Sequence, residues 1–317
     1  MSPRPRHRSF PFSGDARLTD LCEAWCHSQT AIERLQRALD AEPFSRHLAC
    51  VVISGSLSRM ECHAASDLDL LIVLDDRGAA VSEETAATLF NEVWRRIDAE
   101  GLGAARPKSG GVFSQCVSWR ALTDPAVRGI VNEDVTTYGQ RMQLLLDAQP
   151  VLHDRSFDEL QTELLNWYLE TRVSQLFDEP GPFGWLCQDV QRYWRSIWSR
   201  AYWLHEDDAD KSMEVNIKLR SSRAAIVAAF LHAIEAAQHS GGDATDVVAA
   251  LQGQLTVTPL ERLTSGLSTK EASSLLMSYQ TVWCFLSGGD SAACPLPHEI
   301  RTALRNLARC LPDSVRD

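Results

Sequence analysis

Long hydrophobic runs are absent from the 317-residue sequence, in which no segment approaches the roughly 18 consecutive apolar residues of a membrane-spanning helix. The first eight residues carry three arginines and two prolines and lack the apolar stretch of a signal peptide. We therefore expect a cytoplasmic protein without a membrane partner. Proline and charge discourage packing, so residues 1–15 are predicted to be a disordered tail.

Cysteines in metal-binding spacing are also lacking. None of the nine cysteines forms a Cys-x-x-Cys pair, and several stand in apolar runs, where a thiol behaves as a small hydrophobic group. Neither a zinc site nor a disulfide framework is predicted.

Positive charge is in deficit, with 31 Lys and Arg against 42 Asp and Glu and a net charge of −11. A protein that coats nucleic acid needs a basic surface to displace the counterions of the phosphates. Bulk DNA binding is therefore not expected, although a local basic patch remains allowed. Hydrophobic residues make up 44% of the chain and charged residues 23%, which is ordinary for a globular protein.

The most informative segment joins two strand-like apolar runs, residues 49–53 and 68–74. Gly55 and Ser56 follow the first run. Glycine has no Cβ and lets the backbone approach a phosphate, while the Ser56 hydroxyl and the N–H groups at the start of a short helix can donate to phosphate oxygens. Gly55 and Ser56 are predicted to bind the triphosphate of a nucleotide.

Two aspartates open the second apolar run. Alternate residues of a strand project to the same face, so Asp67 and Asp69 are expected to point together. Mg²⁺ prefers oxygen ligands and is commonly held by one or two carboxylates plus the phosphates of its substrate. Asp67 and Asp69 are therefore predicted to be metal ligands and catalytic residues, with Mg²⁺ or Mn²⁺ as the cofactor.

This segment resembles the polymerase β-like nucleotidyltransferase superfamily, and most closely the bacterial proteins related to the uridylyltransferase that modifies the PII nitrogen-signalling protein. Those proteins share a Gly-[Ser/Gly]-x-[Gly/Ser]-Arg-x-Glu run before Ser-Asp-x-Asp. The matching positions here are Gly55, Ser56, Ser58, Arg59, Glu61, Ser66, Asp67 and Asp69. The resemblance extends more weakly over residues 45–230. It implies transfer of a nucleoside monophosphate from a nucleoside triphosphate to an acceptor hydroxyl, with release of pyrophosphate, and it places Arg59 among the nucleotide-binding residues.

One part of the superfamily pattern is missing. Many members carry a third carboxylate on a later strand, but the corresponding residues 111–119 contain no Asp or Glu. Glu133 or Asp134 could take its place, the metal could be held more weakly, or activity could be reduced. Glu61 is more typical of an exposed turn than of a base or metal ligand. The alternative function is thus a catalytically weak or inactive nucleotide-binding module.

Hydrophobic spacing predicts an α+β protein with two domains. Helices over residues 18–39 and 82–97 and a third strand within 104–119 complete a small mixed β-sheet in a nucleotidyltransferase domain, residues 16–150. Strand signals stop near residue 150, and an all-helical domain is predicted for 151–317. Its expected helices span residues 157–177, 183–204, 215–237, 244–251, 270–286 and 297–311.

Two of these helices carry candidate phosphate-binding residues. Asp189 and Arg192 share a helix face at i and i+3, and Arg220 and Arg223 share one on the next helix. In the functional interpretation, Lys218, Arg220 or Arg223 neutralises the triphosphate, while Asp189 orients an arginine such as Arg192. The structural interpretation is a salt-bridged face with solvated arginines.

Four tryptophans in the same region could stack a nucleobase, although aromatic residues at helical spacing are more often core residues. They are Trp185, Trp194, Trp198 and Trp203. The acceptor stays open at this point among a protein side chain, RNA and a small molecule.

Overall fold

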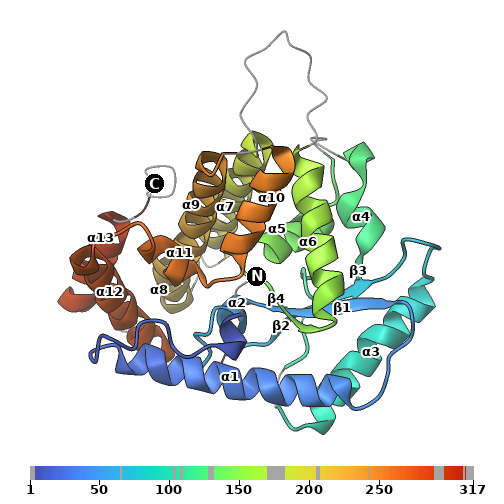
Figure 1. The fold of residues 1–317 in the computed structure, drawn as a ribbon. Coiled ribbons are helices and arrows are strands. Elements are labelled where there is room, and N and C mark those ends of the chain that lie inside the picture. Colours follow the sequence, from blue (N-terminus) through green and yellow to red (C-terminus); the bar gives the residue numbers. More distant parts are fainter. Residues whose placement is uncertain are drawn as a thin grey trace.

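The computed structural model describes residues 4–64, 66–102, 105–107, 110–127, 132–169, 183–204, 208–241, 243–288, 296–309 and 311. The molecule combines a small mixed sheet with a larger number of helices, which confirms the predicted α+β class (Figure 1). None of the helices in this part of the chain is both long and apolar enough to span a membrane.

The sheet has the strand order β3-β2-β1-β4. The central strand β1 pairs antiparallel with β2 and β4, and β2 pairs parallel with β3. Every residue of β1 is buried, which explains its continuous apolar sequence. The strands are β1 (Leu48–Ser54), β2 (Asp69–Leu74), β3 (Val117–Ser118) and β4 (Gln149–Leu152).

Helices cover both faces of this sheet (Figure 1). Helices α1 (Thr19–Asp40) and α3 (Glu83–Ala99) lie below it, and α6 (Asp154–Leu169) lies above it and contacts β1. Helix α3 begins after Ser82, whose hydroxyl accepts a hydrogen bond from the Thr85 N–H. The two helices predicted over residues 18–39 and 82–97 are thereby confirmed.

The remaining elements are mostly helical. Between the strands lie α2 (Gly55–Ser58), α4 (Trp119–Thr123), η2 (Pro125–Val127) and α5 (Val135–Leu146). The elements that follow α6 are α7 (Gly184–Leu204), α8 (Ala209–Lys218), η3 (Leu219–Arg223), α9 (Ala224–His239), α10 (Ala244–Leu255), α11 (Pro259–Thr264), α12 (Thr269–Ser287) and α13 (His298–Arg309). In η3 the helix passes through a π-helical turn.

Several expectations about elements need correction. The third strand is only two residues long, and β4 occupies a segment for which no strand was predicted. Helix α11 starts at Pro259, between the helices predicted over 244–251 and 270–286, because Thr258 and Glu261 form a capping box around it. The part of the helix predicted over 157–177 that lies beyond residue 169 falls outside the described residues.

The disordered tail predicted for residues 1–15 is wrong for residues 4–15. A 3-10 helix, η1 (Pro5–His7), places Arg4 against Asp158 and Arg6 against Asp154 and the Pro150 carbonyl. Phe10 packs in the hydrophobic core that also contains residues from both sides of position 150. Residues 1–3 lie outside the described part, and the domain division at residue 150 stays a prediction.

Candidate nucleotide and metal site

The turn from β1 into α2 brings the Gly-Ser pair against the aspartates. Gly55 has φ +72°, a left-handed conformation that favours glycine. A Cβ on this residue would lie 2.6 Å from Asp69 Oδ2. The contact follows from the sheet register, in which Ser54 at the end of β1 pairs with Asp69 at the start of β2. Glycine is therefore required here both by the left-handed backbone conformation and by the lack of room for a side chain.

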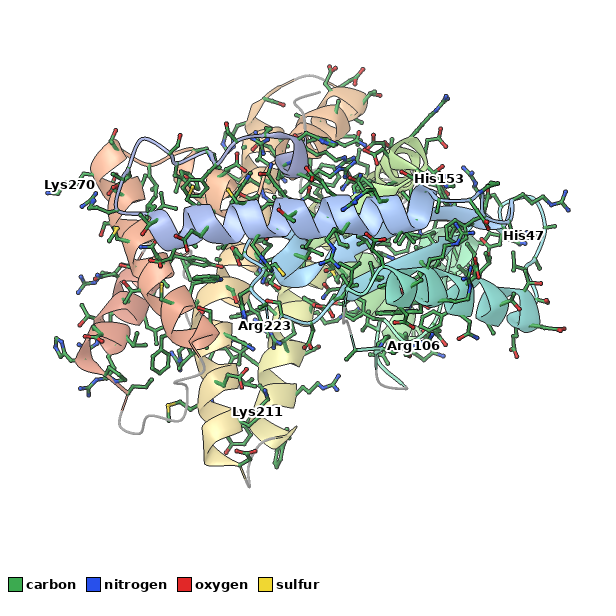
Figure 2. All side chains as sticks on the ribbon, turned by 90° about the horizontal axis from the view of Figure 1, so that it is seen from below. His47, Arg106, His153, Lys211, Arg223 and Lys270 are labelled. Carbon is green, nitrogen blue, oxygen red and sulfur yellow. The ribbon has the colours of Figure 1, made fainter. Side chains whose placement is uncertain are left out.

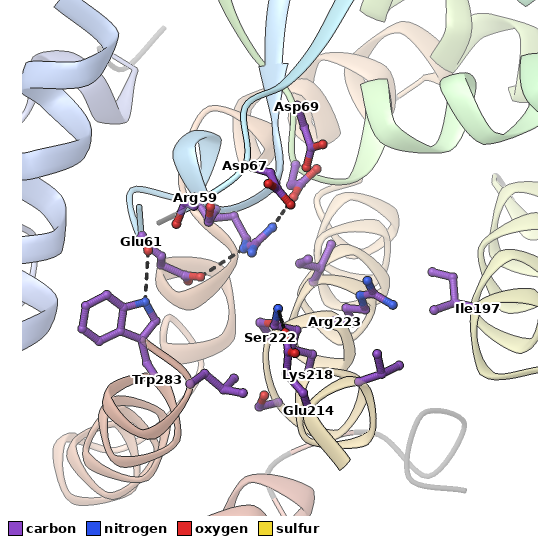
Figure 3. A pocket seen from close by; sticks show the side chains of 18 of the residues that line it. Arg59, Glu61, Asp67, Asp69, Ile197, Glu214, Lys218, Ser222, Arg223 and Trp283 are labelled. Atoms are coloured by element: carbon purple, nitrogen blue, oxygen red, sulfur yellow. Dashed lines mark hydrogen bonds and ion pairs between the residues drawn. The ribbon is translucent and has the colours of Figure 1, made fainter. Parts of the chain in front are cut away.

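Asp67 and Asp69 line one cavity of about 860 Å³ together with Gly55 and Ser56. Figure 3 shows the two carboxylates close together at one end of it. Burial is the largest factor that raises the pKa of Asp69 to about 6, and the negative charges of Asp147 and Asp67 add to it. A buried carboxylate beside two others favours a cation as its next neighbour.

This pair of carboxylates fits a magnesium ion that shares its remaining ligands with a substrate. In the described part of the chain, no three His, Cys, Asp or Glu side chains are grouped closely enough to hold a metal. The fit therefore depends on oxygen atoms from a bound phosphate or water in addition to Asp67 and Asp69.

Glu133 and Asp134 do not replace the missing third carboxylate. Glu133 Oε1 forms an ion pair with Arg141 at 2.5 Å, and Asp134 caps α5 by accepting the Thr137 N–H at 2.7 Å. Strand β3 contributes only Val117 and Ser118. The suggestion that either acidic residue joins the metal site is therefore wrong.

A third aspartate of the cavity was missed by the sequence analysis. Asp147 lies directly before β4 and lines the cavity. Its Oδ1 accepts the Ser54 hydroxyl at 2.8 Å, and its Oδ2 lies 2.7 Å from Arg59 Nη1. Both carboxylate oxygens thus have donors from the protein. The sequence signal was weak, because the strand that positions Asp147 was not recognised.

Arg59 connects Asp147 to Glu61. Its Nε lies 3.1 Å from Glu61 Oε2, and the Tyr279 hydroxyl donates to Glu61 Oε1 at 2.9 Å. Burial alone would lower the pKa of Arg59, but Glu61 and Asp147 raise it above its ordinary value. Glu61 is only 4% exposed, so its interpretation as an exposed turn residue is wrong. Arg59 lines the cavity, yet two of its nitrogens are engaged by carboxylates.

Cations lie across the cavity from the aspartates. Lys218 and Arg223 line it, as Figure 3 shows, and Lys218 forms an ion pair with Glu214 at 2.5 Å. Burial lowers the pKa of Arg223, since removal from water disfavours its charge. An anion that enters the cavity would compensate for that lost hydration.

Arg220 points elsewhere because of the π-helical turn. An i→i+5 turn contains an extra residue, so side chains on either side of it lose their α-helical alignment. The Arg220 guanidinium lies over the Trp198 ring, 5.2 Å from its centroid, and is not among the residues that line the cavity.

Asp189 and Arg192 also lie away from the cavity. Arg192 forms ion pairs of 3.4 Å with Glu133 and with Asp189, and it covers the Tyr138 ring at 3.9 Å. Asp189 accepts the Tyr168 hydroxyl at 2.7 Å. This part of the structure matches the salt-bridge interpretation. Among the four tryptophans, Trp194 is a core residue, whereas the core interpretation is wrong for Trp185 and Trp203, which are exposed.

The cavity thus has acidic residues at the end of the sheet and basic residues on the helices opposite. A metal on the acidic side and a triphosphate between the metal and the basic side would complement both. Asp67 directly before β2 and Asp69 at its start, beside the Gly-Ser turn that follows the antiparallel neighbour β1, form the arrangement that the sequence resemblance implies for a nucleotidyltransferase.

Comparison with known families supports this class. The family described as "Putative nucleotidyltransferase DUF294" matches residues 16–122, which contain the Gly-Ser turn and both aspartates. No curated protein and no solved structure matched the chain.

Proposed function

We propose that this protein is a metal-dependent nucleotidyltransferase that moves a nucleoside monophosphate from a nucleoside triphosphate to an acceptor hydroxyl. The observation that carries the proposal is the placement of Asp67 and Asp69 beside Gly55, facing Arg223 across a single cavity. The family similarity over residues 16–122 supports it independently of the helical part of the cavity.

The residues have separable roles in this reaction. Asp67 and Asp69 hold Mg²⁺ or Mn²⁺, which would neutralise charge on the phosphate oxygens and favour ionisation of the acceptor hydroxyl. Gly55 lets the triphosphate approach the backbone, and the Ser56 hydroxyl donates to it. Lys218 and Arg223 balance its charge from the opposite wall.

The chemical step exchanges one phosphorus–oxygen bond for another. The acceptor oxygen forms a bond to the α-phosphorus, and the bond from that phosphorus to the bridging oxygen of the β-phosphate breaks. Pyrophosphate leaves with the electron pair, and the hydroxyl proton passes to solvent. Positioning and charge neutralisation are sufficient help for such a step, and the cavity provides groups for both.

The alternative function is nucleotide binding with little or no turnover. The observation that favours it is the absence of an acidic residue from β3, together with the engagement of Asp147 by Arg59 and Ser54. Under this alternative, the triphosphate is bound with a metal but no acceptor is modified.

The test measures pyrophosphate release and label transfer from each of the four α-labelled nucleoside triphosphates, with Mg²⁺ or Mn²⁺, in a cell extract. We expect wild-type protein to label one acceptor class and Asp67→Ala/Asp69→Ala to label none. Asp98→Ala is the matched control, because Asp98 is an exposed carboxylate on α3 outside the cavity. Tight metal-dependent nucleotide binding without any transfer would favour the inactive module instead.

A further inference from the structure

Helix α7 forms a wall of the cavity, and none of its residues has a role in the proposed binding of the triphosphate and metal. Four of its residues line the cavity at positions i, i+4, i+7 and i+8, which places them in one stripe along the helix. They are Tyr193, Ile197, Arg200 and Ala201. Figure 3 shows Ile197 well to one side of Lys218, while Trp283 of α12 lies on the other side.

The chemistry of this stripe changes along its length. Tyr193 is close to the acidic end of the cavity, since its hydroxyl accepts a hydrogen bond from Gln143 and Asp147 raises its pKa in addition to the larger effect of burial. Ile197 is half-buried and apolar, and Arg200 is exposed. At a rise of about 1.5 Å per residue, the tyrosine and the arginine are separated by roughly 10 Å along the helix.

Arg200 has no ion-pair partner in the described part of the chain. Two of its cationic neighbours in the cavity differ, because Lys211 and Lys218 both pair with Glu214. A cation that lines a cavity without a carboxylate partner favours an anionic group of a ligand. The charge of Arg200 is among the causes that lower the pKa of Arg223, so the two arginines are neighbours. Arg223 faces the aspartates and Arg200 is exposed, so a second anion beside the triphosphate would be bound by Arg200.

We propose that this stripe is the acceptor site and that the acceptor is a small hydroxylated anion with an apolar middle. Its hydroxyl would lie near Tyr193 at the acidic end, its apolar part against Ile197 and Ala201, and its anionic group at Arg200, roughly 10 Å from the hydroxyl. The inference rests on the proposed function, since it names the acceptor class of that same reaction. Transfer gives a phosphodiester on this molecule and releases pyrophosphate and a proton.

The experiment uses the low-molecular-mass fraction of a cell extract, divided on an anion exchanger into bound and unbound compounds, with α-labelled nucleoside triphosphates and Mg²⁺. We expect wild-type protein to label a compound from the bound, anionic fraction. Arg200→Glu should reduce this transfer about tenfold or more, because a charge-assisted hydrogen bond is replaced by repulsion, whereas Arg200→Lys should retain most of it.

Arg195→Glu is the matched control, since Arg195 is an exposed arginine of the same helix that does not line the cavity. It should transfer as the wild type does. Label on protein or RNA in the undivided extract, or on unbound compounds, would overturn the inference while leaving the proposed function intact, as would full transfer by Arg200→Glu. Failure of the wild type to release pyrophosphate from any nucleotide would overturn both.

Discussion

At the scale of single residues, the candidate site depends on close approach. Gly55 leaves just enough room for the Asp69 carboxylate, and the same glycine sets the turn that carries Ser56. The metal-binding and phosphate-binding groups are therefore linked by one contact. A substitution at position 55 disturbs both.

We predict that Gly55→Ala abolishes metal-dependent nucleotide binding and lowers the free energy of unfolding by about 1–3 kcal/mol. The added Cβ would lie 2.6 Å from Asp69 Oδ2, on a backbone with φ +72°. Calorimetric titration and urea unfolding measure the two effects. Gly253→Ala is the control. Gly253 lies inside α10, a Cβ added there would have no neighbouring atom within 4 Å, and the substitution should be neutral or stabilising. Equal behaviour of the two variants would contradict the steric argument.

The pKa of Asp69 leads to a prediction about pH. Its folded value of about 6 exceeds its ordinary value of 3.8, so the folded protein binds this proton more tightly than the unfolded chain does. The stability that Asp69 contributes is fully present below about pH 4 and is lost as the pH rises through about 6.

Magnesium should offset this loss, because it binds the ionised carboxylate. We expect MgCl₂ to raise the melting temperature more at about pH 8 than at about pH 5, and Asp69→Asn to remove the difference. Thermal unfolding across this pH range is the measurement. A magnesium effect that is the same at both pH values would contradict the assignment of Asp69 as a ligand.

The sequence predicted the parts of the site that are close together along the chain. Gly55 and Ser56 directly follow β1, and Asp67 and Asp69 lie just before and at the start of β2, so their proximity follows from a single antiparallel pairing. Asp147 reaches the same place from a distant segment and could not be found by spacing.

For the charged residues on helices, the sequence left two interpretations open, phosphate binding or a salt-bridged surface. Spacing identifies which side chains share a face, but tertiary packing decides where that face points, and Arg192 points to Glu133. The turn η3 further separates Arg223 from Arg220 in a way that α-helical spacing does not reveal.

At the scale of elements, α12 is attached directly to the loop after α2. The Tyr279 hydroxyl donates to Glu61 Oε1, and Trp283 Nε1 donates to the Glu61 carbonyl at 3.0 Å. Glu61 in turn holds Arg59. A helix from the last part of the chain thus fixes a loop that begins the candidate site.

We predict that Tyr279→Phe lowers the free energy of unfolding by about 1–3 kcal/mol, because it leaves a buried carboxylate oxygen without its donor. Nucleotide affinity should fall as well, since Arg59 loses part of its support. Chemical denaturation and nucleotide titration test this. Tyr202→Phe removes a hydroxyl from a side chain that is 74% exposed and should change neither quantity. If Tyr279→Phe were as harmless, α12 would not hold the loop.

The elements that spacing predicted well have a single strong pattern. Strand β1 is apolar throughout, and α1 and α3 bury residues three and four positions apart. By contrast, β4 contains Pro150 and only four residues, and β3 is shorter still. Such short strands form because a neighbouring strand pairs with them, and the spacing of hydrophobic residues along the sequence does not reveal that pairing.

At the scale of the whole molecule, the N-terminal segment joins parts that are distant in sequence. Arg6 is buried against β4 and the start of α6, and Arg8 forms two hydrogen bonds with Glu261 of α11, at 2.7 and 3.1 Å. Figure 2 shows α1, which follows this segment, crossing the molecule beneath the sheet. The segment acts as a strap between the sheet and the helices above it.

We predict that Arg6→Ala destabilises the protein by about 2 kcal/mol, because the Pro150 carbonyl loses its charged donor and Asp154 loses an ion-pair partner. Arg155→Ala removes an ion pair from a side chain that is 93% exposed and should cost less than about 0.5 kcal/mol. Thermal unfolding of both variants gives the comparison. If residues 4–15 were a disordered tail, neither substitution would change the melting temperature appreciably.

The strap also constrains the order in which the protein can mature on the ribosome. The hydrogen bond of Arg8 requires Glu261, which is synthesised 253 residues later, and that of Arg17 requires Ser273, which is synthesised 256 residues later. The segment with Arg8 and Arg17 is synthesised before α11 and α12 and can complete these contacts only after them, and long-range closure of this kind slows folding. Until α11 and α12 emerge, the sheet lacks its strap and the loop that carries Glu61 lacks its support, so a nascent chain that already contains both aspartates has no finished site.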